Sequence, residues 1–108
     1  MEALPREVEF YVDGDGNCPF KEWLESLKDH VARAQVDKRI TRVRLGLFGN
    51  CDEVGEGVIE LKLDTGPGYR LYCAQDGRTL VVLLCGGTKR RQQSDIEQAR
   101  KFWRDYKS

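Results

Sequence analysis

Residues 58–91 read VIELKLDTGPGYRLYCAQDGRTLVVLLCGGTKRR and contain three apolar, strand-like segments separated by two turn signals. The first turn signal is Gly66-Pro67-Gly68, and the second is Asp76-Gly77, whose residues tolerate the positive φ of a tight hairpin. This pattern predicts a meander of three antiparallel strands that ends in a glycine pair and a cluster of positive charge. We expect the rest of the chain to pack around this meander.

The predicted hairpins place two cations side by side. The length of the first loop sets Leu63 across from Tyr69, and therefore Lys62 across from Arg70 on one face of the sheet. In one interpretation Glu60 offsets the two charges, or both tips splay into water. In the other, the pair holds an anion. On the second hairpin, a two-residue turn would place Arg70 across from Leu83.

Composition describes an ordinary globular protein. A chain of 108 residues with 40% hydrophobic and 33% charged residues fits a single domain, residues 1–108, with one core. No apolar run approaches the roughly 20 residues needed to cross a bilayer. Because the N-terminus also lacks a basic-then-apolar signal peptide, we expect a cytoplasmic protein without membrane partners.

Charge is balanced overall but segregated along the chain. Residues 31–45 carry five bases against one acid, and residues 69–91 again carry five against one, whereas the segments before each are acidic. Such blocks usually form salt-bridged surface, yet a fold that gathers the two basic segments would present a basic patch.

The four cysteines are predicted to be free, buried thiols. Cys18, Cys51, Cys73 and Cys85 show no C-x-x-C spacing, and the sequence has one histidine, so a zinc site is disfavoured. We expect Cys73 and Cys85 to lie on opposite faces of the sheet, which keeps them from forming a disulfide. The sequence predicts no metal and no cofactor.

The segment before the meander predicts an edge strand and a helical hairpin. Residues 6–12 alternate in part and end at a loop rich in aspartate and glycine. A first helix is expected from Pro19, and a second carries Ala32, Val36, Ile40, Val43 and Leu47 at helical spacing. On the second helix, we expect Lys38, Arg39 and Arg42 to project into solvent, away from that apolar stripe. Residues 48–57 are expected to form a loop.

The C-terminal segment predicts one more helix. Residues 92–107 carry Ile96, Ala99, Trp103 and Tyr106 on one stripe, and Ser94 with Glu97 suggests a capping box. The fold class is therefore α+β, a small antiparallel sheet of an edge strand plus the three-stranded meander, packed by the helical hairpin and the C-terminal helix.

Several of these residues together match a family pattern. They are Glu60-Leu61-Lys62, residues 66–72, residues 83–89, Gln92, Asp95-Ile96 and Ala99. In this pattern the chain resembles the addiction-module killer proteins of the RelE/HigB/ParE toxin superfamily, a HigB-like branch, from about Val8 to Tyr106. The resemblance implies a small antiparallel sheet packed by an N-terminal helical hairpin and a C-terminal helix, the same arrangement as predicted above.

The resemblance also implies a function. It is that of the toxin in a bacterial type II toxin–antitoxin module, with a cognate antitoxin, usually a helix-turn-helix protein, as partner. Many such toxins cleave messenger RNA on the ribosome with a sheet face of Lys and Arg. The implied catalytic residues are Arg70, Lys62 and Lys89, and the residues expected to bind RNA are Lys38, Arg39, Arg42, Arg90 and Arg91.

The chemistry suits Arg70 and leaves other functions open. Cleavage by the 2′-hydroxyl of the RNA needs positive charge at the phosphorane, and guanidinium grips phosphate with paired hydrogen bonds. Relatives of the ParE kind bind DNA gyrase without an RNase centre, so a non-enzymatic gyrase inhibitor is the alternative. A third hypothesis is a structural or regulatory protein without activity. The paired cations Lys62 and Arg70 favour the endoribonuclease.

Overall fold

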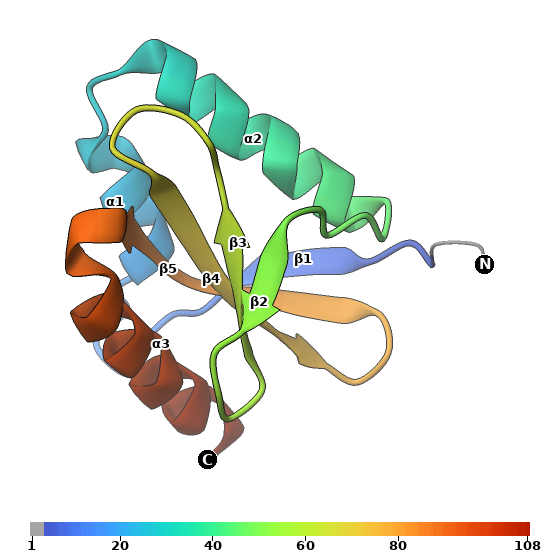
Figure 1. Ribbon diagram of the computed structural model, residues 1–108. Helices are drawn as coiled ribbons and strands as arrows, with labels where there is room; N and C mark the ends of the chain where they lie inside the picture. Colours follow the sequence, from blue (N-terminus) through green and yellow to red (C-terminus); the bar gives the residue numbers. More distant parts are fainter. Residues whose placement is uncertain (1–3) are drawn as a thin grey trace.

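A computed structural model describes residues 4–108 and shows an α+β fold, in which a five-stranded mixed sheet lies between two helical layers (Figure 1). The strands are β1 (Glu7–Phe10), β2 (Cys51–Glu53), β3 (Val58–Lys62), β4 (Tyr69–Asp76) and β5 (Leu80–Thr88). The helices are α1 (Pro19–Ser26), α2 (His30–Arg44) and α3 (Gln92–Lys107), and a short 3-10 turn, η1 (Lys89–Arg91), precedes α3. None of the helices within residues 4–108 is both long and apolar enough to span a membrane.

The predicted meander forms the centre of the sheet, whose strand order is β1-β5-β4-β3-β2. The predicted N-terminal edge strand is confirmed, and it pairs with β5 in parallel. Parallel strands need a long crossover connection between them. The confirmed helical hairpin α1–α2 is part of the connection from β1 to β5. At the other edge, β2 pairs antiparallel with β3. The sequence analysis had placed β2 in a loop, because three residues are too few to show a strand pattern.

The register of the first hairpin is as predicted, and that of the second is not. Lys62 lies across from Arg70 on β3 and β4. Arg70 lies across from Gly87 on β5, whereas the sequence analysis expected Leu83. One cause is the turn, which spans residues 77–79 instead of two residues, and the other is a β-bulge after Tyr72. The end of β5 with its glycine pair therefore lies beside Arg70.

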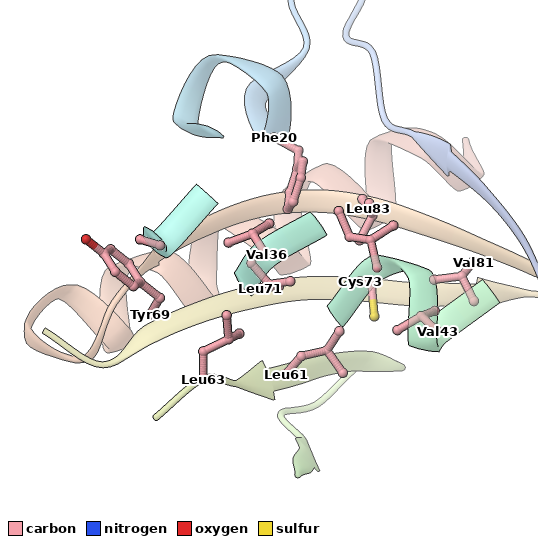
Figure 2. Close-up of a cluster of buried hydrophobic side chains, with 12 residues drawn as sticks. Phe20, Val36, Val43, Leu61, Leu63, Tyr69, Leu71, Cys73, Val81 and Leu83 are labelled. Atoms are coloured by element: carbon pink, nitrogen blue, oxygen red, sulfur yellow. The ribbon is translucent and has the colours of Figure 1, made fainter. Parts of the chain in front are cut away.

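Alternating side chains build a core on each face of the sheet. On one face, apolar residues of β3, β4 and β5 pack with α1 and α2, as Figure 2 shows for Leu61, Leu71, Leu83, Phe20 and Val36. On the other face, the core includes residues of the same strands and the buried stripe of α3, formed by Ile96, Ala99 and Trp103. Each face of the sheet is thus covered by helix, with α2 and α3 on opposite sides in Figure 1.

The helix ends show which sequence signals operate. Asp29 caps α2, because its carboxylate accepts hydrogen bonds from the backbone N–H groups of Val31 and Ala32. The predicted C-terminal helix is confirmed as α3, which begins at Gln92. Its predicted capping box is wrong, since the Ser94 hydroxyl donates to the carbonyl of Arg91 and no side chain caps the helix.

All four cysteines are free, as predicted. Cys73 lies in the core beneath α1 and α2 and Cys85 in the core beneath α3, which confirms their separation by the sheet. Burial raises the pKa of both thiols to about 12. Cys18 and Cys51 are half-buried.

Candidate functional site

Arg70 is a covered cation without a partner. It lies on the face of the sheet that α3 covers, between Lys62 on β3 and Gly87 on β5. The residue is only 9% exposed, and its Nε atom is buried with no hydrogen-bond partner. Burying a charge without an ion-pair partner costs desolvation free energy. Such a group is retained most readily where it has a function. Arg70 is therefore the centre of the candidate site.

Glu60 does not form an ion pair with Arg70 or Lys62. Its carboxylate is 1% exposed and accepts hydrogen bonds from the Tyr72 hydroxyl, 3.0 Å away, and from Nε2 of Gln92, 2.9 and 3.1 Å away. Burial, followed by the Glu60 charge, raises the pKa of Tyr72. Within residues 4–108, no hydrogen bond or ion pair joins Glu60 to Lys62 or Arg70. The interpretation in which Glu60 offsets the two cations therefore has no direct contact to support it. Glu60 instead ties the first turn of α3 to the sheet.

Lys62 is ion-paired, but weakly held. Its ammonium contacts the carboxylate of Asp52 on β2, and the two side chains are 27% and 58% exposed, respectively. Exposed ion pairs contribute only about 0–1 kcal/mol, so an incoming phosphate can replace this carboxylate. The unpredicted strand β2 therefore supplies the counter-charge of a predicted site residue.

Asp95 fills the space left by the glycine at position 87. A Cβ atom on Gly87 would clash with the carboxylate of Asp95, whose Oδ2 atom is buried without a hydrogen-bond partner. Burial raises the pKa of Asp95, and the Arg91 charge opposes that rise. Because Gly87 is the cross-strand neighbour of Arg70, this carboxylate lies next to Arg70 on the same face. Asp95 was not predicted as a site residue, because the predicted register sets Arg70 across from Leu83 instead of Gly87.

The basic corner Lys89–Arg91 adjoins this cluster. All three side chains are exposed in η1, at the point where β5 passes into α3. The backbone N–H of Lys89 donates to the carbonyl of Gly68, at 2.8 Å, which holds the β3–β4 loop beside the corner. One end of the sheet thus carries Lys62, Arg70 and the basic corner Lys89–Arg91.

The three cations of α2 that were predicted to bind RNA lie in the other helical layer. Lys38 and Arg42 are exposed, as predicted. The prediction for Arg39 is wrong: its guanidinium is half-buried and donates to the carbonyls of Phe48, Lys62 and Asn50 at 2.8, 2.6 and 2.7 Å. Arg39 therefore connects α2 to the edge of the sheet. Burial lowers the pKa of its guanidinium.

Comparison with known proteins gives one informative relative. No family model matches the chain. An uncharacterized protein of Haemophilus influenzae is 44% identical over 81 residues, which cover 75% of this chain and 82% of the relative. At this identity and coverage two chains share their fold and ancestry, so this protein belongs to the same family as the Haemophilus influenzae protein.

Proposed function

We propose that this chain is the toxin of a bacterial type II toxin–antitoxin module and acts as a ribosome-dependent mRNA endonuclease. The observation that carries the proposal is the unpartnered Arg70 guanidinium, set directly across from Lys62 and next to the exposed corner Lys89–Arg91. A phosphodiester would supply the hydrogen-bond acceptors that the Arg70 side chain lacks within residues 4–108. The family resemblance of residues 60–99 points the same way.

In the proposed reaction, the 2′-oxygen of the RNA attacks the adjacent phosphorus while the bond to the 5′-oxygen breaks. The proton of the 2′-hydroxyl leaves to a base, and the departing 5′-oxygen takes up a proton, which yields a 2′,3′-cyclic phosphate and a 5′-hydroxyl. Arg70 and Lys62 would hold the extra negative charge of the phosphorane, and Lys89 would complete the set. Arg90 and Arg91 would contact neighbouring phosphates.

Access to Arg70 sets a condition on this proposal. The first turn of α3 lies over the cluster and is held there by the Gln92–Glu60 hydrogen bonds. Arg70 is 9% exposed. The first turn of α3 therefore has to shift before a phosphate can form paired hydrogen bonds with the guanidinium. The ribosome would position the RNA, so that modest chemical groups suffice.

The same coverage supports a second candidate function. A non-enzymatic inhibitor that binds DNA gyrase needs no open catalytic face, and here Arg70 is covered while Lys62 is paired with Asp52. In that case the cluster would serve to fix α3 on the sheet.

Brief expression in bacteria distinguishes these two functions. The endonuclease should arrest growth and create new messenger 5′ ends inside translated codons, and Arg70→Met should abolish both effects. Arg78→Met, which removes an exposed arginine of the β4–β5 turn, is the matched control and should leave them unchanged. Growth arrest with intact messages and altered DNA supercoiling would overturn the endonuclease and establish the gyrase inhibitor.

The proposal also includes a cognate antitoxin, expected to be a small helix-turn-helix protein encoded beside this chain. Co-expression should restore growth, and the two proteins should co-purify. A neighbouring protein that neither binds the chain nor restores growth would contradict this part of the proposal.

A further inference from the structure

A groove of about 650 Å³ runs between α2 and the end of β3, in the helical layer opposite α3. Its lining combines apolar side chains with cations: Val31, Ala34, Leu63, Lys38, Arg39 and Arg42. Asp64 is the one carboxylate among the residues that line it. The groove therefore has a positive character and an apolar floor.

Two of the cations are free to bind a ligand. Lys38 and Arg42 are exposed, and neither forms a side-chain hydrogen bond or an ion pair within residues 4–108. They are four residues apart on α2, so they project from the same side of the helix. Arg39, by contrast, is held by three backbone carbonyls and fixes the wall of the groove.

An uncovered apolar residue accompanies these cations. Val31 is 63% exposed, although it is a β-branched aliphatic residue in the first turn of α2. Val31 and Ala34 occupy one end of the groove, while Lys38 and Arg42 follow along the helix. Between residues 31 and 42, α2 rises about 16 Å, which matches about five residues of extended chain.

We propose that this groove binds a short acidic segment of a partner protein. An apolar side chain of the segment covers Val31 and Ala34, and its carboxylates pair with Lys38 and Arg42. Charge complementarity selects the partner, because the three cations Lys38, Arg39 and Arg42 face a single carboxylate, that of Asp64, in the lining. Single-stranded RNA fits the groove less well, since bases stack on aromatic side chains and the lining holds no Phe, Tyr or Trp and a single imidazole, that of His30.

Selection of peptides from a random display library against the purified chain tests this proposal. The most enriched sequence is then synthesised with a fluorescent label, and its affinity is measured by anisotropy. We expect enriched peptides that combine Asp or Glu with an aliphatic residue. Arg42→Glu should weaken binding about tenfold, and added salt should weaken it further.

Arg44→Glu is the matched control. Arg42 and Arg44 both lie in the last turn of α2, so the two charge reversals disturb the helix dipole alike, but only Arg42 lines the groove. Arg44→Glu should leave peptide affinity within about twofold of the wild type. The assay requires no toxicity, so its outcome is separate from that of the proposed function.

Three outcomes would overturn the proposal. They are the absence of acidic residues from the enriched peptides, an equal loss of affinity in Arg42→Glu and Arg44→Glu, and failure to enrich any peptide. A labelled single-stranded RNA oligonucleotide is measured in parallel. If it binds the wild type and loses affinity with Arg42→Glu while the peptide does not, the groove is an RNA site instead.

Discussion

Replacing Arg70 and Arg39 by methionine should have opposite effects on stability. Methionine keeps much of the aliphatic volume of arginine and removes the charge. The Arg70 side chain forms no hydrogen bond or ion pair within residues 4–108, and its Nε is buried. Losing an unpaired covered charge relieves a desolvation cost, so Arg70→Met should change the free energy of unfolding by less than about 1 kcal/mol, or increase it.

Arg39→Met should be clearly destabilising. It removes hydrogen bonds to the carbonyls of Phe48, Lys62 and Asn50. Hydrogen bonds to charged groups contribute about 1.5–3 kcal/mol each and are not additive, so we expect a loss of about 2–4 kcal/mol. For a domain of this size that lowers the Tm by about 10–25 °C. Thermal unfolding followed by circular dichroism measures both variants.

Activity then separates a functional Arg70 from a structural one. Loss of one charge-assisted contact at a transition state costs about 3 kcal/mol, so Arg70→Met should cleave messenger RNA about a hundredfold more slowly with its fold intact. Arg70→Lys should recover part of the activity, because it restores the charge without the planar fork. A fully toxic Arg70→Met protein, or one that is harmless because it unfolds, would refute the assignment.

Three further predictions concern the surroundings of the site. Asp52→Asn frees Lys62 and should tighten RNA binding by a few-fold in a filter-binding assay; unchanged or weaker binding would count against the anion site. Gly86→Ala drives a methyl group into the indole of α1 and should cost about 1–3 kcal/mol in urea unfolding, whereas a neutral result would contradict the packing described. The thiols of Cys73 and Cys85 ionise near pH 9 when unfolded and near 12 when folded, so stability should fall as pH rises through this window, by up to about 1.4 kcal/mol per pH unit for each thiol. Alanine at both positions should flatten the decline, and an equally steep decline in that variant would assign it to other groups.

The sequence predicts the fold where local signals are strong. The Gly66-Pro67-Gly68 turn sets the first hairpin, so the pairing of Lys62 with Arg70 follows from chain geometry. The three-residue turn at 77–79 and the β-bulge have no comparable signature, and the predicted register of the second hairpin was therefore wrong along its whole length. On α2, Lys38 and Arg39 look alike in a helical projection. Only the positions of the Phe48, Asn50 and Lys62 carbonyls decide that Arg39 is structural.

The cations of the candidate site could be predicted from the sequence, but the helix that covers them, α3, could not be placed over them. Lys62 and Arg70 share a face by register, and the basic corner follows them in sequence. The contact that closes α3 over this face joins Glu60 to Gln92 across 32 residues of chain. Such a contact depends on how a helix docks on a sheet, which amphipathic spacing alone does not determine. Sequence patterns thus indicated which charges gather and left open whether they are accessible.

The glycine pair at the end of β5 explains why the two helical layers meet the sheet so closely there. A Cβ on Gly86 would enter the ring of Trp23 from α1, and a Cβ on Gly87 would enter the carboxylate of Asp95 from α3. Absent side chains on successive residues therefore allow one helix to approach from each face. Because Gly87 is also the cross-strand neighbour of Arg70, the missing side chain leaves room for the Asp95 carboxylate at the strand position opposite Arg70. The close approach of α3 beside Arg70 is in this way set by backbone packing, and an incoming phosphate would have to displace the first turn of that helix.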